Sequence, residues 1–311
     1  MAPSRTPKYL TGDENAINEF LDKFDTFLLD CDGVLWSGDH IFPGVKETID
    51  LLQSKDPGKR TVFVTNNSTK SRAEYLKKFK SKGISATVDD VFGSSYSAAI
   101  YIKRILELPP PKNKVFVLGE AGIETELESE NVPFVGGTDP AFRRDITEAD
   151  FVGLADGSAL DPDVGVVLAG LDFHVNYLKL ATAYHYLLRG AKFLATNTDS
   201  TLPMNHTFFP GAGSVLIPLT NMIKKEPLAL GKPSQAMMDA VEGKFHLDRS
   251  RTCMIGDRLN TDIQFGIEGK LGGTLAVLSG VSKKSDWEAE DAVAVPAYYV
   301  DTLSDLRGPG Q

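Results

Sequence analysis

The chain has 311 residues, 42% of them hydrophobic and 24% charged, a composition that excludes global disorder and suits one large domain or two modest ones. Its formal net charge of -9 argues against a general binder of nucleic acid or of anionic membranes, although a bound cation could still admit an anionic substrate. Two cysteines, Cys31 and Cys253, are too few for a disulfide framework or a cysteine-rich zinc site.

The segments that would indicate export or membrane insertion are missing from the sequence. The first twenty residues contain no apolar stretch of the secretory type, and no run of about 18 apolar residues predicts a transmembrane helix. We therefore expect a cytoplasmic protein that keeps its cysteines reduced.

Short apolar runs alternate with helical patterns along the chain. The runs predict strands at Phe24–Asp30, Thr61–Asn66, Val115–Leu118, Phe151–Ala155, Lys192–Asn197, Thr252–Asp257 and Thr274–Leu278. The helical patterns lie at Val45–Leu52, Ser68–Ser81, Ser234–Phe245 and Asn260–Gly266. This alternation predicts an α/β fold with a parallel sheet.

Two carboxylates, Asp30 and Asp32, follow the first apolar run. In an extended chain, residues i and i+2 point the same way, so the two carboxylates would converge and require a cation or a shared proton. Gly33 allows a sharp turn after them. A strand-ending Asx turn accounts for the same residues equally well.

Hydroxyl and amide side chains fill the end of the second run, Thr65, Asn66, Asn67 and Ser68. A helix that begins there would add free backbone N–H groups, and together these groups could cradle phosphate oxygens. Taken alone, a strand end with a helix N-cap at Ser68 explains the segment better.

A lysine stands between glycine and proline in Gly231-Lys232-Pro233. The glycine exposes the lysine and the proline stiffens the turn, so a fixed ammonium could offset the charge of a nucleophile and a phosphate. A surface lysine in a turn is the commoner reading of such an isolated motif.

Asp257 ends the apolar run that begins at Thr252, and Asp262 follows in the first turn of a predicted helix. Asp262 could serve as a helix cap, whereas Asp257 has no such role at a strand end. Oxygen ligands of this kind suit Mg²⁺. Because strand carboxyl ends form the usual ligand crevice of an open α/β sheet, we expect Asp30, Thr65 and Asp257 to face it, with Lys232 approaching from its loop.

The four motifs, in this order, resemble those of the haloacid-dehalogenase-like phosphatases: DxDGV at 30–34, TNN at 65–67, GKP at 231–233 and GDRLNTD at 256–262. The resemblance implies an Asp30 nucleophile that forms an aspartyl-phosphate and an Asp32 general acid/base. It also implies Mg²⁺ held by Asp30, the Asp32 carbonyl and Asp257, with Asp262 behind them. The phosphoryl group would be bound by Thr65, Asn66, Asn67 and Lys232.

The long insertion between the second and third motifs resembles a C2-type α/β cap. The implied division is a Rossmann-like parallel-sheet core at 1–91 and 228–311, with the cap at 92–227. An acid at Asp32 favours phosphoester hydrolysis, because dehalogenase relatives lack an acid there and transport ATPase relatives carry Thr. Relatives with such a cap often dimerise through it, so a homodimer through the cap is expected.

The cap segment Gly170–Leu180 resembles the substrate-specificity loop of eukaryotic phosphoglycolate phosphatases. This likeness implies a small phosphorylated metabolite as substrate, 2-phosphoglycolate first, with 4-nitrophenyl phosphate as an artificial one, and His174 and Tyr177 as substrate contacts. His174 could instead cap a helix or lie at a dimer contact. A pyridoxal-phosphate or phosphotyrosine phosphatase and an inactive metabolite-binding protein remain alternatives, and oxidation of Cys31 could inhibit an enzyme.

Overall fold

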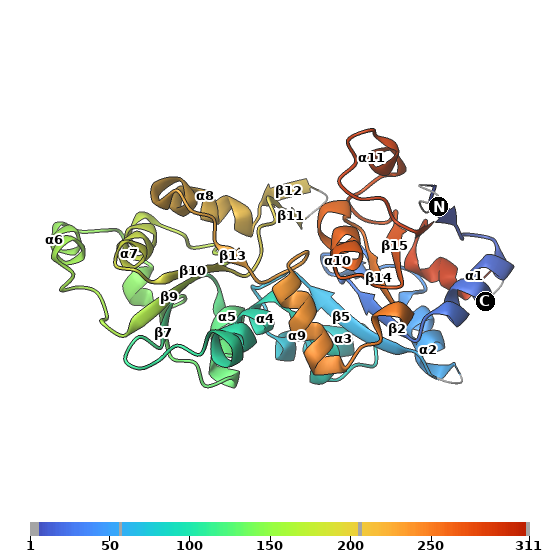
Figure 1. Cartoon of the computed structure of the whole chain (residues 1–311), viewed down its shortest axis with the longest axis horizontal. Coiled ribbons are helices and arrows are strands. Elements are labelled where there is room, and N and C mark those ends of the chain that lie inside the picture. The colour runs from blue at the N-terminus through green and yellow to red at the C-terminus, as the bar shows by residue number, and fades with distance from the viewer. Residues whose placement is uncertain (1–5, 56–57, 205–206, 309–311) are drawn as a thin grey trace. The chain divides into compact units, whose positions relative to one another are not determined.

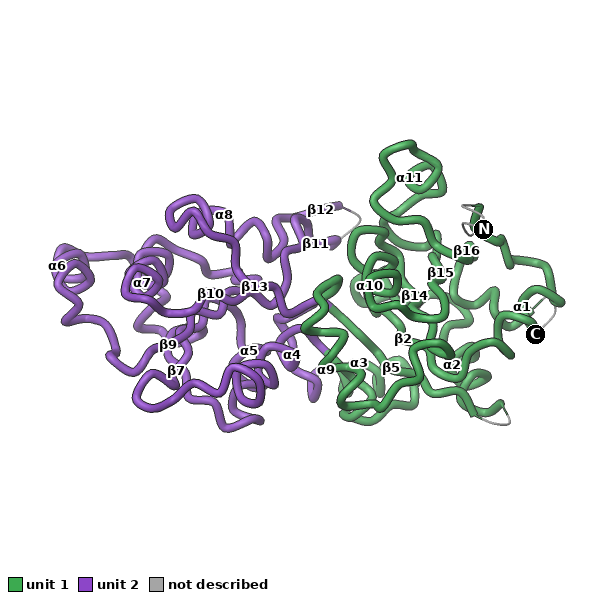
Figure 2. Tube along the Cα trace, viewed as in Figure 1, with its two compact units in different colours: residues 1–65, 75–92, 232–311 green, residues 66–74, 93–231 purple. Residues whose placement is uncertain are grey.

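The computed structural model describes residues 6–55, 58–204 and 207–308. The chain divides into two compact units, one of residues 1–65, 75–92 and 232–311 and the other of residues 66–74 and 93–231 (Figure 2). The second unit begins and ends within a few residues of the expected cap, 92–227, but it also takes in the segment 66–74. In the described part of the chain, no helix is both long and apolar enough to cross a membrane.

The first unit is built on a seven-stranded sheet in the order β1-β16-β15-β14-β2-β5-β6 (Figure 1). The pairs from β1 through to β5 are parallel. A two-stranded antiparallel ribbon, β3 (Trp36–Ser37) with β4 (His40–Ile41), follows β2. The sheet strands are β1 (Lys8–Tyr9), β2 (Thr26–Leu29), β5 (Arg60–Thr65), β6 (Val91–Gly93), β14 (Thr252–Gly256), β15 (Gly273–Val277) and β16 (Tyr298–Val300).

Helices cover both faces of this sheet because its strands are apolar on both sides. Phe27 and Leu29 of β2 belong to a core that includes residues of α1, α2 and α3. Leu28, between them, points to the other face and is equally buried. The helices of this unit are α1 (Glu14–Lys23), α2 (Val45–Ser54), α3 (Arg72–Ser81, whose first turn belongs to the second unit), α9 (Gln235–Phe245), α10 (Gln264–Glu268) and α11 (Lys284–Glu288).

The second unit has its own five-stranded parallel sheet, in the order β13-β10-β9-β7-β8. Its apolar core includes residues of β7, β9 and β10 and of the helices α7 and α8. A hairpin, β11 (Thr201–Met204) with β12 (Thr207–Pro210), precedes α8. The remaining elements are β7 (Lys114–Leu118), β8 (Phe134–Gly136), β9 (Val164–Ala169), β10 (Lys192–Ala195), β13 (Leu228–Ala229), α4 (Ser94–Ile100), α5 (Ala121–Ser129), α6 (Glu148–Asp156), α7 (Tyr177–Leu188) and α8 (Ala212–Ile223).

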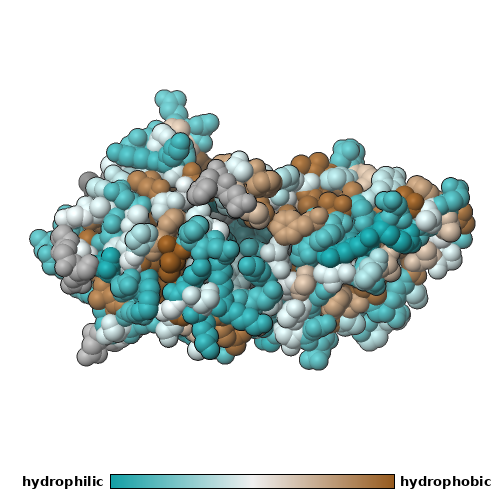
Figure 3. Space-filling model, turned by 180° about the vertical axis from the view of Figure 1, so that it is seen from behind, coloured by the Kyte–Doolittle hydropathy of each residue, from teal (hydrophilic) through white to brown (hydrophobic). Residues whose placement is uncertain are grey.

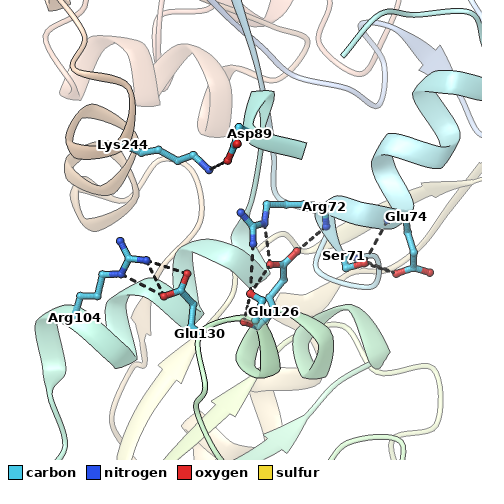
Figure 4. A network of polar contacts seen from close by, with 9 residues as sticks. Ser71, Arg72, Glu74, Asp89, Arg104, Glu126, Glu130 and Lys244 are labelled. Carbon is cyan, nitrogen blue, oxygen red and sulfur yellow. Dashed lines mark hydrogen bonds and ion pairs between the residues drawn. The ribbon is translucent and has the colours of Figure 1, made fainter. Parts of the chain in front are cut away.

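The short segment 66–74 is attached to the second unit by a buried ion pair (Figure 4). Arg72 Nε lies 2.9 Å from Glu126 Oε2, and the Arg72 backbone N–H donates to the other oxygen of Glu126 at 2.6 Å. The guanidinium also lies 3.2 Å from the ring centroid of Tyr96. Glu126 is 2% exposed, so these contacts satisfy a carboxylate that solvent cannot reach.

One predicted strand is wrong. Phe151–Ala155 lies within α6, where Thr147 caps the helix through reciprocal hydrogen bonds with Asp150. Phe151 and Val152 are 47% and 59% exposed, so this apolar run is not buried on both faces as a central strand would be. The other six predicted strands are present, and none of their ends is shifted by more than two residues.

The predicted helix start at Ser68 is also wrong. The α3 helix begins at Arg72, and Ser71 exchanges backbone and side-chain hydrogen bonds with Glu74, as a capping box does (Figure 4). The predicted helix at Asn260–Gly266 is present as a π-helical turn, Leu259–Ile263, followed by α10. Four residues of loop therefore separate the TNN motif from its helix.

Candidate active site

Three predicted site residues lie at the ends of neighbouring parallel strands in the first unit. Asp30 follows β2, Thr65 is the last residue of β5, and Asp257 follows β14. These strands are adjacent in the order β14-β2-β5, so their carboxyl ends meet at one edge of the sheet. Asp30 is 8% exposed, Thr65 2% and Asp257 3%, so the site is buried.

Lys232 joins this group from the loop that precedes α9. Its ammonium lies 2.7 Å from Asp30 Oδ1 and 2.6 Å from Asp262 Oδ1, and it donates to the Val64 carbonyl at 2.7 Å. The loop is fixed by Ser234, whose hydroxyl accepts from the Ala236 N–H at the start of α9. The lysine is therefore no surface residue: it is 3% exposed and bound to two carboxylates.

The turn after β14 is organised around Asp262. Its Oδ2 accepts from the backbone N–H groups of Asp257 and Arg258, both at 3.1 Å. Asp257 in turn accepts from the Val281 N–H at 2.8 Å through Oδ2. Gly33, at φ 88°, packs against the same carboxylate so closely that a Cβ at this position would collide with it. The turn glycine of the first motif therefore makes room for the acid of the fourth.

The carboxylates of Asp30, Asp257 and Asp262 each offer an oxygen within 4.8 Å of the others. Burial raises the pKa of Asp257 to about 7, and the Asp262 carboxylate adds to the rise. Burial likewise raises the pKa of Asp30 well above its ordinary value, against the opposing effect of Lys232. Three acids face one ammonium here, so the donor set carries the surplus negative charge and the oxygen ligands that a divalent cation requires.

Burial alone would lower the pKa of Lys232, but the attraction of Asp262 and Asp30 outweighs it and holds the pKa above its ordinary value. The ammonium is therefore charged throughout the physiological range, as a phosphoryl-binding group needs to be.

Asp32 does not belong to the buried carboxylate group. The strand β2 ends at Leu29, and Cys31 to Trp36 form a turn closed by the Leu35 N–H, which donates to the Cys31 carbonyl at 2.8 Å. The expectation that Asp30 and Asp32 lie on one extended strand and point the same way is therefore wrong, because the strand ends before Asp30 and the chain turns after it. Asp32 is half-buried, and its Oδ1 accepts from the Trp36 indole N–H at 2.8 Å.

The TNN motif is divided between the two units. Thr65 belongs to the first, where its hydroxyl lies 3.3 Å from the Tyr75 hydroxyl. Asn66 and Asn67 belong to the second. The Asn66 amide donates to Asp199 at 3.1 Å, and Asn67 Oδ1 accepts from the Thr69 N–H at 2.9 Å, which forms an Asx turn.

In the second unit, the predicted specificity residues lie just before and at the start of α7. Asn176, not His174, caps this helix, through a hydrogen bond from the Lys179 N–H. His174 Nδ1 is 3.0 Å from Glu120 Oε1, and Tyr177, the first residue of the helix, is 63% exposed.

A network that the sequence did not reveal holds the loop before α7 in place. Glu120 accepts from the Phe173 N–H at 2.9 Å and pairs with Arg143 at 3.0 Å. The fully buried Lys179 lies 2.7 Å from Asp172 Oδ2. Glu120, Asp172 and His174 also lie close enough together to bind a metal ion. However, Arg143 already neutralises the charge of Glu120, and Lys179 that of Asp172.

Cys31, between the two acids of the first motif, is completely buried in the core beneath the sheet. Burial raises the pKa of its thiol well above the ordinary value, and the Asp30 carboxylate adds to the effect. The side chain therefore packs as an apolar group.

The comparisons with known proteins agree with this geometry. A family model described as haloacid dehalogenase-like hydrolase matches residues 27–133, and a related model of HAD-like hydrolases matches residues 229–306. A 4-nitrophenylphosphatase of Schizosaccharomyces pombe is 50% identical over 289 residues, which cover 93% of this chain and 95% of that protein.

Two further relatives extend the comparison. The chloroplastic phosphoglycolate phosphatase 1A of Arabidopsis thaliana is 41% identical over 299 residues, covering 95% of this chain and 80% of that protein. A glycerol phosphate phosphatase of Mycobacterium tuberculosis, solved in complex with magnesium, has a TM-score of 0.75 and 28% identity, and the match covers 92% of this chain and 77% of that one.

The chain therefore belongs to the haloacid dehalogenase-like hydrolases. The predicted α/β fold and the predicted family of hydrolases are confirmed.

Proposed function

We propose that this protein is a Mg²⁺-dependent phosphatase of small phosphomonoesters, with 2-phosphoglycolate as its expected substrate and 4-nitrophenyl phosphate as an artificial one. The observation that carries the proposal is the buried contact of Lys232 with Asp30 beside Asp257 and Asp262. This arrangement supplies a fixed carboxylate nucleophile, a cation for the phosphoryl group and the oxygen ligands of a metal ion.

Asp30 would act as the nucleophile. Its carboxylate oxygen attacks phosphorus and forms an aspartyl-phosphate, while the bond from phosphorus to the ester oxygen breaks. Asp32 donates a proton to the departing oxygen. It then takes a proton from water, whose oxygen attacks the phosphorus and releases inorganic phosphate with Asp30 restored.

The phosphoryl group would be held by the Lys232 ammonium and the Thr65 hydroxyl, with Asn66 and Asn67 contributing from the following loop. Asp30, the Asp32 carbonyl and Asp257 would hold Mg²⁺, which offsets the charge of the attacking carboxylate and the phosphate. Asp262 would support this set from behind, since its oxygens already bind two backbone N–H groups and Lys232.

The choice of substrate would lie in the second unit. The names of the two curated relatives are the reason for placing 2-phosphoglycolate and 4-nitrophenyl phosphate first. His174 and Tyr177 would contact the organic part of the ester, since both are exposed, His174 on the loop that Glu120 and Asp172 hold and Tyr177 at the start of α7.

The test is a panel of esters assayed for phosphate release with and without Mg²⁺: 2-phosphoglycolate, glycerol phosphate, pyridoxal 5′-phosphate, phosphotyrosine and 4-nitrophenyl phosphate. We expect the highest kcat/KM among the natural esters for 2-phosphoglycolate. A preference for pyridoxal 5′-phosphate or phosphotyrosine would change the proposed substrate and leave the proposed phosphatase mechanism standing. Absence of metal-dependent release from every ester would show an inactive binding protein instead.

We further propose that two copies associate through the second unit, in the cytoplasm. Large apolar side chains are exposed on α6, on the loop before α7 and on α7 itself: Phe151, Val152, Phe173, Val175, Tyr177 and Leu188. Exposed apolar groups also appear among hydrophilic ones on the face drawn in Figure 3. Light scattering should give the mass of a dimer, and Phe151→Glu should reduce it to that of a monomer.

A further inference from the structure

The Asp32 carboxylate is bound by a tryptophan four residues later in the chain. The Trp36 indole Nε1 donates to Asp32 Oδ1 at 2.8 Å. The backbone makes this contact possible, because the turn after β2 brings the chain back on itself and the Gly33 N–H donates to the Trp36 carbonyl at 2.8 Å. Asp32 and Trp36 therefore face each other as partners in an isolated β-bridge.

The indole is closely packed in this position. Trp36 is completely buried, at 0% exposure. Its ring stacks on Tyr75 at a centroid distance of 6.3 Å and 26°, and packs against Phe79 at 5.3 Å. On the ring, the Lys78 ammonium lies 4.1 Å from the centroid, and it also donates to the Gly38 carbonyl in the turn between β3 and β4.

We infer that Trp36 is a positioning residue for Asp32: its indole N–H fixes one carboxylate oxygen and leaves the other to exchange protons with the substrate. An indole has one donor and no acceptor, so it can hold an oxygen without competing for the transferred proton. The inference rests on the proposed function, in which Asp32 protonates the leaving oxygen.

The same aromatic pair reaches a second site residue. Tyr75, stacked on Trp36, places its hydroxyl 3.3 Å from the Thr65 hydroxyl at the end of β5. Two site side chains, one in the turn after β2 and one at the end of β5, are thus bound by the same pair of aromatic residues. Precise placement of such groups matters because a proton is transferred only within hydrogen-bond distance.

A purely structural tryptophan makes a different prediction from a positioning one. Loss of the N–H should harm a step that needs Asp32 as an acid and spare a step that does not. A carboxymethyl or glyceryl leaving group requires protonation, whereas 4-nitrophenolate leaves as a stable anion. The value of kcat/KM reports the formation of the phosphoenzyme, so it isolates this acid step.

The experiment compares kcat/KM for 2-phosphoglycolate and for 4-nitrophenyl phosphate in the wild type, Trp36→Phe and a Trp36→benzothienylalanine variant, which keeps the ring volume and lacks the N–H. Trp287→Phe is the matched control, because Trp287 is buried in a separate apolar cluster. Asp32→Asn is the reference for complete loss of the acid. Thermal denaturation checks folding in each case.

We expect both Trp36 variants to lose about tenfold in kcat/KM for 2-phosphoglycolate and less than about threefold for 4-nitrophenyl phosphate. Trp287→Phe should leave the ratio of the two values unchanged. Equal losses on both esters in the Trp36 variants, or no loss on either, would overturn the inference. The proposed function would still stand in that case, because the wild type hydrolyses the esters. A wild type that hydrolyses neither ester would overturn both.

Discussion

Lys232 Nζ lies 2.7 Å from Asp30 Oδ1, and the two residues are only 3% and 8% exposed. They are 202 positions apart in the sequence and meet at the edge of one sheet. The pair joins the aspartate of the first motif to the lysine of the third. Each charge compensates the other, which reduces the cost of burying both.

Replacing this lysine should therefore affect both stability and turnover. In Lys232→Met, the carboxylates of Asp30 and Asp262 lose their shared cation, so we expect unfolding to be easier by about 3–5 kcal/mol and turnover to fall at least a hundredfold. Urea denaturation and phosphate release measure the two effects. Lys244→Met is the control, because Lys244 pairs with the 79%-exposed side chain of Asp89 (Figure 4) and should change stability by less than about 1 kcal/mol. Equal effects of the two substitutions would contradict the role given to Lys232.

The nucleophile is tested by Asp30→Asn. The amide keeps the shape of the side chain but cannot form an acyl phosphate, so we expect a folded protein without turnover. The measurement is release of 4-nitrophenol, together with intact-mass analysis after acid quenching, which should detect a phosphorylated wild type and an unmodified variant. Activity within tenfold of the wild type would exclude covalent catalysis by Asp30.

Mg²⁺ should stabilise the folded protein as well as activate it. At a concentration of about one hundred times its Kd, a ligand that binds only the folded state adds about 2.7 kcal/mol, which corresponds to a Tm increase of roughly 3–6 °C. We expect this increase in the wild type after EDTA treatment, and not in Asp257→Asn. Asp89→Asn, at an exposed site, should retain it. Ca²⁺ should bind but inhibit, because its larger and less regular shell disturbs the alignment of Asp30 with phosphorus.

The stability of the metal-free protein should fall as the pH rises. The pKa of Asp257 is about 7 in the folded state against an ordinary value of 3.8, so between these values the folded protein holds a proton that the unfolded chain has lost. Stability present at pH 4 is therefore lost progressively up to about pH 7, by at most about 4 kcal/mol. Urea denaturation at pH 5 and pH 8 in EDTA measures the difference. Asp257→Asn should flatten it, and an unchanged slope in that variant would assign the effect to other groups.

The loop before α7 should govern the choice of substrate. We expect His174→Ala and Tyr177→Ala to lower kcat/KM for 2-phosphoglycolate by roughly ten- to a hundredfold and to affect 4-nitrophenyl phosphate much less. Glu120→Gln should act in the same direction, because Glu120 holds His174 and the Phe173 N–H. His185→Ala is the control, since His185 interacts with Arg189 late in α7. Equal losses on both esters would mean that the loop supports the fold or a dimer contact.

The sequence predicted the strand ends that carry the site because buried apolar runs followed by Asp or Thr are local patterns. It misplaced Phe151–Ala155, because a short apolar run looks the same in a strand and in a half-exposed helix, and the capping pair Thr147 and Asp150 decides between them. Trp36 was missed because its role depends on a turn that reverses the chain. The spacing of four residues after Asp32 was the only available signal.

The pairing of Arg72 with Glu126 has a consequence for recombining relatives of this protein. An exchange that places only residues 93–231 in a relative without an arginine at position 72 would leave Glu126, 2% exposed, without the guanidinium that binds it. A buried charge stripped of its partner is strongly destabilising. A chimera that takes its second unit from another protein should therefore fold well only if residues 66–74 come from the same donor. The unit that can be exchanged consists of two separate stretches of sequence, joined to the rest of the chain at four points.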